Sequence, residues 1–586
     1  VLGTPNTVSV DNVCHAPRKI ASRYTYGGWA VPDYDHPPRC LLVWGRNSLQ
    51  TGGDAPPARF HRAFDGGTRF IVVDPRKISL ASRADVWLTP RPGSDGLLAL
   101  GLLHVIVHEE LYDQAFVSRW TVGFERLRAW LNAYPLDEVA RRTWVPASQI
   151  RAAARLYATS GPAAIQWGNA VDQTGNAFQT ARALAILRAI TGNLDVPGGD
   201  IFREALPLRG RDDFAPAREP GKDRPAQVGS QYTLAAEARI VPSQEASRAI
   251  LSGRPYPLKA GLILGSNPLL TYPNAQETYR ALRKLDMLIV AELFMTPTAA
   301  LADIVLPVAA SLEYDDLVDH AGFLAARPKI LDPPGECLSD LQWINKIASR
   351  LGLGEYFWED DVGAMDAMLA PAGLTWEQLA GLGLQRAEVR YRQHLDGGFP
   401  TPSGRVELFS ERLRAMGLDP LPCYREPPQT PFGSPELVGD YPLVLTNCKN
   451  PVYYHASHRQ LPSLRERSPE PVTELHPETG AKLGLRPGDL AYIETPQGRI
   501  RQKVRLNADL DPRVVVVAFG WWFPERGPAG LYGWREANLN LLTDSAPPHD
   551  PAMGSANLRG LVCRVYRTDE GYVRARPGRS SSHSRE

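Results

Sequence analysis

The pattern of apolar and polar positions divides the first two hundred residues into short strands and longer helices. Apolar runs of strand length occur at 40–44, 69–73, just after residue 84, and at 163–167. Runs of helical length occur at 96–107, from about 146 onward, and at 177–190. Strands that are apolar throughout and alternate with helices are typical of a parallel sheet covered on both faces. We therefore predict an α/β domain over residues 1–215.

The chain changes character twice after this domain. Predicted strands at 260–264 and 287–291, with a helix at 275–284 between them, indicate a second α/β domain over 216–439. From residue 441 onward the apolar runs become short and evenly spaced, at 443–445, 490–494, 500–504, 514–518 and 561–565. This spacing predicts a C-terminal β-barrel over 440–575, followed by a disordered tail at 576–586. The predicted fold is α/β, with two interleaved parallel-sheet, Rossmann-like domains and a barrel.

Two segments rich in proline and glycine, 206–231 and 420–442, are predicted to be linkers. The first should connect the two α/β domains, and the second should precede the barrel.

Composition and charge exclude several classes of function. The 586 residues include 65 Lys and Arg against 64 Asp and Glu, so no overall field favours nucleic acid or an anionic membrane surface. The longest apolar run, 96–107, is too short to span a bilayer. The 6 cysteines are scattered without a CxxC pair, so neither a disulfide framework nor an iron–sulfur or zinc site is predicted.

The chain begins at Val1, and its first methionine is Met287. Because the opening residues already have the character of a domain interior, we expect a fragment or a processed form. A targeting signal could have been lost with the missing part, so the compartment stays open between the cytoplasm and the periplasm of a prokaryote.

The segment with the most distinctive chemistry is Cys14-His15, followed by Pro17, Arg18 and Lys19. A thiolate is a soft metal ligand, and adjacent positive charge lowers the pKa of a thiol. Cys14 is therefore a candidate protein ligand to a metal carried by a cofactor. The alternative is that Cys14 is a small buried hydrophobic residue, as most single cysteines are.

Two polar segments follow predicted strands of the first domain. Trp44, Gly45 and Asn47 lie where a parallel sheet presents a ligand loop, at the carboxyl end of a strand. Asp74 follows the next strand and can accept hydrogen bonds from guanine or ribose, while Arg76 can face phosphate. A plain turn is the alternative for both segments.

Further candidates lie at equivalent places along the chain. Asp95 begins the apolar helix, and Trp167, Gly168 and Asn169 open a loop of small residues in front of another helix. Gly265, Asn267 and Pro268 follow a strand of the second domain in the same way as the first loop. We therefore expect two similar nucleotide sites in one chain.

Taken in order, these segments resemble the molybdenum and tungsten oxidoreductases of the dimethyl-sulfoxide-reductase superfamily, over nearly the whole chain. Within the barrel, CKNPVYYHASHRQLP with His455 and His458, and NLNLLTDSAPPHDP with Asn538, resemble the branch that contains acetylene hydratase and the thiosulfate and polysulfide reductases. The resemblance implies a double-psi barrel that closes over the pterins. It also implies an [4Fe–4S] cluster motif ahead of Cys14, in a part that this chain lacks.

The resemblance implies a bis-molybdopterin guanine dinucleotide cofactor, with Mo or W held by four dithiolene sulfurs and Cys14. His15 would then move a proton at the metal during two-electron redox chemistry on a small-molecule substrate. An iron–sulfur electron-transfer subunit is the expected partner, without nucleic acid and without a membrane span in this chain.

Three other functions stay open. Formate oxidation would use Cys14, His15 and Arg209, although the Arg211 and Asp212 that follow do not continue the formate pattern. A lyase that hydrates an unsaturated substrate would use the same framework without net electron transfer. A structural homologue would keep the fold and lose the metal, which the retention of Cys14 argues against.

Overall fold

The computed structural model describes residues 3–50, 57–203, 206–210, 213–214, 225–320 and 322–568 of the chain. The predicted tail at 576–586 lies outside these residues, as do Arg211 and Asp212, which follow the candidate Arg209. Part of the first predicted linker lies outside them as well, so the domain boundaries expected near 215 and 440 stay predictions.

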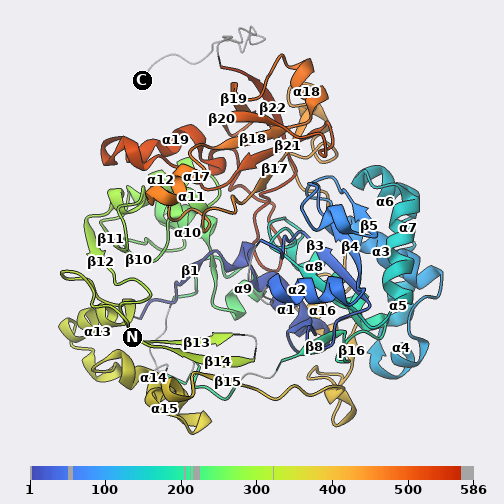
Figure 1. Ribbon diagram of the computed structural model, residues 1–586, viewed down its shortest axis with the longest axis horizontal. Helices are drawn as coiled ribbons and strands as arrows, with labels where there is room; N and C mark the ends of the chain where they lie inside the picture. Colours follow the sequence, from blue (N-terminus) through green and yellow to red (C-terminus); the bar gives the residue numbers. More distant parts are fainter. Residues whose placement is uncertain are drawn as a thin grey trace.

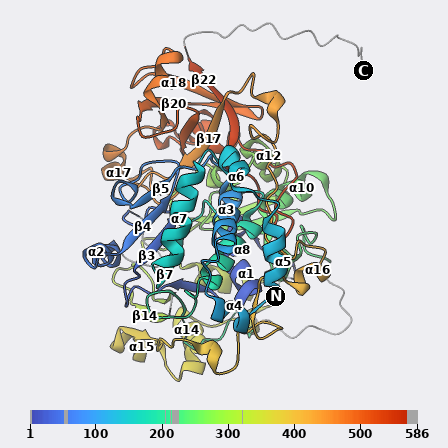
Figure 2. The same cartoon turned by 90° about the vertical axis from the view of Figure 1, so that its right-hand side faces the viewer.

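The first parallel sheet has the strand order β5-β4-β3-β7. Its strands are β3 (Cys40–Trp44), β4 (Arg69–Val73), β5 (Val86–Leu88) and β7 (Ala163–Trp167). All neighbouring pairs are parallel. Every residue of β3 and β7 is buried, because helices cover both faces. The covering helices are α1 (Ala16–Tyr26), α2 (Pro57–Asp65), α3 (Asp95–His108), α7 (Ala147–Thr159) and α8 (Ala177–Ile190) (Figure 2).

The second parallel sheet consists of β10 (Ala260–Leu264), β11 (Met287–Glu292) and β12 (Ile304–Pro307). One face packs against α12 (Ala275–Leu282), whereas Leu262, Met287 and Ile304 on the other face are exposed. The two sheets repeat the same local geometry. Asp85 Oδ2 accepts a hydrogen bond from Phe70 N at the start of β4, and Asp303 Oδ2 accepts the equivalent bond from Leu288 N in β11.

The region after the second sheet differs from the α/β pattern expected for 216–439. An antiparallel sheet of β13 (Asp316–His320), β14 (Phe323–Arg327) and β15 (Leu384–Arg386) lies there. It packs with α14 (Asp361–Leu369) and α15 (Trp376–Leu382), and α13 (Asp340–Arg350) is hydrogen-bonded to α14 (Figure 1). The second domain therefore combines a parallel sheet with a separate antiparallel unit.

The C-terminal region forms the predicted barrel, which closes in the order β17-β21-β18-β20-β19-β22. Its strands are β17 (Leu443–Cys448), β18 (Val472–Leu475), β19 (Leu490–Thr495), β20 (Gly498–Leu506), β21 (Val514–Ala518) and β22 (Leu561–Arg567). In Figure 1 the barrel lies at one end of the molecule, with the two parallel sheets beneath it on opposite sides. The α/β fold class with a C-terminal barrel is thus confirmed.

The second predicted linker, 420–442, is fastened to the first domain. Glu426 pairs with the buried Arg91 at 2.9 Å and with Arg142 at 2.7 Å. These ion pairs fix the connection between the antiparallel unit and the barrel. Within the described residues, no helix is both long and apolar enough to cross a membrane.

Candidate active site

Cys14 lies where three parts of the molecule meet. It follows the short 3₁₀ helix Asp11–Val13, is half-buried, and its Sγ accepts a hydrogen bond from Asn169 Nδ2 at 3.5 Å. Burial and the nearby Asp172 carboxylate raise the pKa of the Cys14 thiol, and this outweighs the opposing effect of Lys449 and Arg18. The adjacent Arg18 does lower this pKa, as expected, but the pKa is raised overall because desolvation and a carboxylate outweigh the cations.

Arg18 holds the Cys14 loop in place. Its Nε donates to Asp172 Oδ2 at 2.7 Å, and its Nη2 donates to the Cys14 carbonyl at 2.8 Å and to Asn169 Oδ1 at 3.2 Å. A further bond from Nη1 reaches the Trp167 carbonyl at the end of β7. Arg18 therefore links the thiol loop directly to the carboxyl edge of the first sheet.

Removing the Arg18 charge is expected to destabilise the fold. The Asp172 side chain is fully buried, and burial raises its pKa to about 7 even with Arg18 beside it. Arg18→Met leaves this carboxylate unpaired, at a cost of about 3–5 kcal/mol in unfolding free energy, measured by denaturant titration. In the matched control Arg126→Met, which breaks an exposed pair with Glu411, no change beyond measurement scatter is expected. Equal stability of the two variants would contradict the role of Arg18.

His15 is the N-cap residue of helix α1 and lines a cavity of about 700 Å³. Its ring packs edge-on against Trp29, with 4.9 Å between ring centroids. The cavity lining includes aromatic residues, among them Trp29, Phe202 and Phe399, and charged residues of both signs, namely Lys19, Arg203, Arg390, Asp319 and Asp396. The residue next to the candidate metal ligand thus lines a space large enough for a small substrate.

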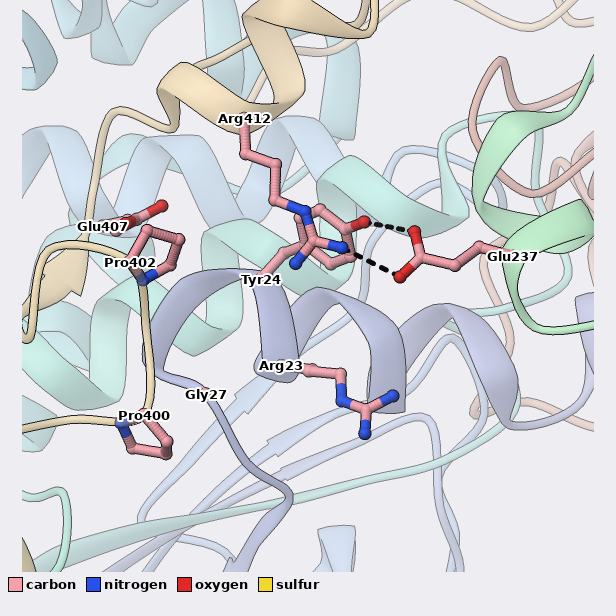
Figure 3. A pocket seen from close by; sticks show the side chains of 8 residues that line it. All are labelled: Arg23, Tyr24, Gly27, Glu237, Pro400, Pro402, Glu407 and Arg412. Carbon is pink, nitrogen blue, oxygen red and sulfur yellow. Dashed lines mark hydrogen bonds and ion pairs between the residues drawn. The ribbon is translucent and has the colours of Figure 1, made fainter. Parts of the chain in front are cut away.

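A second cavity, of about 500 Å³, lies at the other end of α1 (Figure 3). Tyr24 and Arg412 both point to Glu237, with bonds of 2.5 and 2.8 Å, and Arg412 lies over the Tyr24 ring. Because these polar groups pair with one another at the surface, the cavity near His15 is the better candidate for a substrate.

The predicted aromatic residues at the sheet edge lie in the interior. Trp44 and Trp167 are opposite one another in the β3–β7 pairing and are almost fully buried. Trp44 Nε1 donates to Asp95 Oδ1 at 2.8 Å, so two predicted cofactor residues bind each other. Trp167 stacks on Trp29, and the Arg188 guanidinium lies over the Trp167 ring, 4.4 Å from its centroid. Trp44 and Trp167 are therefore packing residues of the first domain.

Gly45 and Gly168 are needed for the contact between two loops. Gly45 has a left-handed backbone, with φ of 56°, and a Cβ on Gly168 would lie 2.3 Å from the Gly45 carbonyl oxygen. Asn47, two residues further on, donates to Gln50 Oε1 at 2.6 Å. Larger residues at these glycines would push apart the loops after β3 and β7. The loop after β7 contains Asn169, which bonds to the Cys14 thiol.

The loop after β10 repeats this geometry but is open. Gly265 has φ of 53° and donates to the Ala291 carbonyl, as Gly45 does to the Val73 carbonyl, yet no heavy atom lies within 4 Å of a Cβ built on Gly265. Asn267 accepts from Thr298 through Oδ1, and its buried Nδ2 makes no hydrogen bond within the described residues. Pro268 begins the short helix α11 (Pro268–Thr271).

Asp74 and Arg76 take different roles at the end of β4. Asp74 is half-buried, its Oδ1 accepts from Arg76 N at 2.8 Å, and burial raises the pKa of its carboxyl to about 6. Arg76 Nη2 instead donates to the buried Glu474 of the barrel, at 2.8 Å. In this structure Arg76 joins the first domain to the barrel, while Asp74 accepts a hydrogen bond from the Arg76 amide.

The barrel candidates lie on loops near the same region. His455 and His458 are half-buried and have positive φ values of 52° and 68°. Burial and Lys449 lower the pKa of His455 to about 4, so this ring is neutral at pH 7. Asn538 is fully buried and donates to the Leu269 carbonyl, so it fastens the barrel to helix α11.

Arg209 is exposed, and its amide donates to the Met368 carbonyl of α14. It is not among the residues that line the cavity at His15. Among the predicted site residues, Asn169 bonds to Cys14 and Trp44 bonds to Asp95, whereas Arg209 bonds through its amide to α14.

The sequence did not single out two cations of the C-terminal region, Lys449 and Arg559. Lys449 follows β17 directly, and its charge acts on the Cys14 thiol. Arg559 donates to Gln173 Oε1 at 2.9 Å and to the Asn447 carbonyl at 3.3 Å. The sequence offered one feature that could have identified Lys449, which is its position inside the barrel motif CKNPVYYHASHRQLP.

The residues present fit a metal that arrives with its own ligands. Within the described residues, no group of three or more His, Cys, Asp or Glu side chains could hold a metal ion. A single thiol at Cys14 is therefore suited to a metal whose other ligands come from a cofactor. At the edge of the second sheet, the open space at Gly265 and the unpaired Asn267 Nδ2 would provide room and a hydrogen-bond donor for such a cofactor.

Comparison with known proteins decides the family. The model described as molybdopterin oxidoreductase matches residues 10–350, and the model described as molydopterin dinucleotide binding domain matches residues 443–561. The chain belongs to the molybdopterin oxidoreductase family. The resemblance found in the sequence is thus confirmed.

Individual members of the molybdopterin oxidoreductase family are similar over most of this chain. Acetylene hydratase of Syntrophotalea acetylenica is 32% identical, covering 97% of this chain and 82% of the relative. Formate dehydrogenase H of Escherichia coli is 28% identical, covering 89% and 74%. The molybdopterin-containing subunit of thiosulfate reductase of Salmonella typhimurium is 25% identical, covering 89% and 73%. The solved structure of acetylene hydratase from Pelobacter acetylenicus matches with a TM-score of 0.86 at 30% identity, covering 97% and 83%.

Proposed function

We propose that this chain is the catalytic part of a molybdenum or tungsten enzyme that carries out two-electron redox chemistry on a small substrate. The observation that supports this proposal is the pairing of Cys14 with His15. Cys14 presents its thiol at the junction of the first sheet and the barrel, and His15 lines the adjacent cavity.

The cofactor proposed is a pair of molybdopterin guanine dinucleotides that carry Mo or W. When bound, such a cofactor supplies the electron acceptor and donor for the reaction. Asp74 would hold one dinucleotide at the edge of the first sheet, and Asn267 with Gly265 would hold the other at the second sheet. The barrel loops with His455 and His458 would cover the cofactor.

The chain's own residues orient the substrate and move its proton. The cavity lining carries three cations, Lys19, Arg203 and Arg390, against two carboxylates, Asp319 and Asp396, and this balance favours a polar substrate. A ring nitrogen of His15 would accept or return the substrate proton beside the Cys14 thiolate.

A hydratase is the second candidate, because acetylene hydratase is similar over 97% of this chain. In that case the same cavity would hold an unsaturated substrate and water, and His15 would move protons without net electron transfer. Formate oxidation is a third candidate, and it requires Arg209 to approach His15. A purely structural role is a fourth, and it requires that the protein bind no metal.

Metal analysis of the holoprotein, combined with reduction by dithionite, separates these functions. Two-electron chemistry predicts stoichiometric Mo or W and reoxidation of the reduced enzyme by an oxidising substrate. Metal that hydrates acetylene to acetaldehyde, with no substrate-linked redox change, would identify a hydratase. Absence of both metals would overturn the proposal in favour of a structural role.

An iron–sulfur electron-transfer subunit is the proposed partner. One relative is named as the molybdopterin-containing subunit of thiosulfate reductase, which supports a multi-subunit assembly. We propose that the protein lies in the same compartment as this subunit, either the cytoplasm or the periplasm.

Asp74→Asn is expected to weaken cofactor binding by about 1.5–3 kcal/mol, since a charge-assisted acceptor becomes a neutral amide. The substitution keeps an acceptor for the Arg76 amide, so the local turn survives. The measurement is pterin content per chain after dilution and long dialysis. Full pterin content in the variant would show that Asp74 only ends the strand.

A further inference from the structure

His394 is a second histidine of the cavity that His15 lines. It belongs to the short 3₁₀ helix Gln393–Leu395 and is 7% exposed. Its ring stacks on the Phe399 ring with 4.8 Å between centroids, and the Trp120 ring packs edge-on against it at 4.9 Å. Because rings on two sides fix its plane, the His394 imidazole has a defined orientation in the cavity wall.

The carboxylate of Asp195 lies against this imidazole. Its Oδ2 is 3.4 Å from His394 Nδ1 and accepts a hydrogen bond from Gln393 N at 2.5 Å. The Asp195 side chain is fully buried, and among the described residues His394 is the only ionisable side chain that pairs with it. A carboxylate that contacts one ring nitrogen fixes the tautomer and leaves the other nitrogen for a ligand. Within the described residues, His394 Nε2 makes no hydrogen bond.

The segment that carries His394 is bonded to the first domain. Tyr391 Oη donates to the buried Asp33 Oδ2 at 2.9 Å, and Arg392 N donates to the Asp195 carbonyl at 2.8 Å. Asp195 itself has a left-handed backbone, with φ of 61°. These bonds hold the two residues together although they are 199 positions apart in the sequence.

The charges of the cavity favour an anion once His394 is protonated. The rings that pack on His394 do not titrate, so its charge is set by Asp195 and by the groups across the cavity. Three permanent cations line the cavity against two carboxylates, and two further histidines can add charge. These groups are Lys19, Arg203, Arg390, Asp319, Asp396, His15 and His320.

We infer that His394, held by Asp195, binds the negatively charged oxygen of a small oxyanion in this cavity and takes up a proton from solvent when the anion binds. The inference rests on the proposed function, because it takes the cavity at His15 as the substrate site. A bound negative charge favours the charged imidazole. The proton from water forms the Nε2–H bond, and Nε2–H then donates to the oxygen of the anion. The substrate class is therefore a carboxylate or a tetrahedral oxoanion, and Asp195 is a positioning residue.

The test measures anion binding to the holoenzyme by isothermal titration calorimetry, with acetate as the carboxylate probe and sulfate as the tetrahedral probe. Titrations at pH 7.5 in two buffers of different ionisation enthalpy give the number of protons taken up per bound anion. We expect a measurable uptake, at most about one proton, in the wild type. His394→Gln should lose this uptake and bind the preferred anion about tenfold more weakly, because a charge-assisted hydrogen bond is lost.

Two further variants serve as controls. His394→Phe keeps a ring to stack on Phe399, so it repeats the test without the packing change that glutamine introduces. His108→Gln removes an exposed histidine that bonds to Asn132, and it should keep the wild-type affinity and proton uptake.

Asp195→Asn tests the positioning role. The substitution keeps an acceptor for Gln393 N and removes the charge beside the ring. In long-range ¹H–¹⁵N spectra of protein labelled at histidine, we expect the His394 signal to show a protonated Nδ1 in the wild type. The Asn variant should shift toward the tautomer with a protonated Nε2. A residue that only packs against His394 would leave the tautomer unchanged.

The outcomes separate this inference from the proposed function. Failure of both probes to bind, or binding without proton uptake, overturns the inference at any metal content. Uptake that is lost in His15→Gln or His320→Gln but kept in both His394 variants also overturns it. Tighter binding of acetate or of sulfate, with uptake lost in the His394 variants, supports it and identifies the shape of the anion. Absence of Mo and W from the wild-type protein overturns the proposed function instead.

Discussion

Cys14→Ala is expected to abolish turnover while the protein keeps most of its pterin. The thiol is the group that the chain itself would supply to the metal, and its loop is fixed by Arg18 and Asn169. The expected pterin contacts are spread over two sheets and the barrel, so loss of one thiolate should leave them largely intact. The measurements are steady-state activity and pterin and metal content per chain in a full-length protein.

Two other cysteines provide the controls. Cys337 is half-buried and lies in a proline-rich connection, so Cys337→Ala should keep wild-type activity. Cys448 ends β17 and is the other half-buried thiol near the barrel loops. If Cys448→Ala abolished turnover while Cys14→Ala remained active, the metal ligand would belong to the barrel, and the role proposed for Cys14 would be wrong.

The strands of both parallel sheets were predictable because their apolar runs are uninterrupted and end at glycine, asparagine or aspartate. The antiparallel β13–β15 unit was not predicted, because its strands are half-exposed and carry charges such as Asp316 and Arg327. Its third strand, β15, also follows three helices, so no local hairpin pattern marks it. The apolar pattern therefore predicted the strands that are buried in the parallel sheets and missed the half-exposed strands of the antiparallel sheet.

The site was predictable only in part. Polar loops after β3, β4, β7 and β10 identified the sheet edges, because carboxyl ends of parallel strands present such loops to ligands. The bond between Trp44 and Asp95, and that between Arg76 and Glu474, depend on contacts between distant segments. Lys449 was missed for the same reason, since only the folded chain places the barrel against Cys14.

His15→Ala is expected to lower turnover by roughly 10²- to 10⁴-fold, the usual contribution of a positioned acid or base. Metal and pterin content should stay at the wild-type level, because the His15 side chain lines the cavity and packs on Trp29. The measurement is the rate across pH 5 to 9 at full metal content.

A second substitution separates proton transfer from packing. His15→Gln keeps a polar side chain of similar size beside Trp29 but cannot exchange a proton near neutral pH. If His15 moves a proton, the glutamine variant should be as slow as the alanine variant. If the glutamine variant recovered most of the wild-type rate, His15 would serve to shape the cavity. A wild-type rate for His15→Ala over the whole pH range would eliminate both roles and leave Cys14 as the only residue of this pair that acts in the reaction.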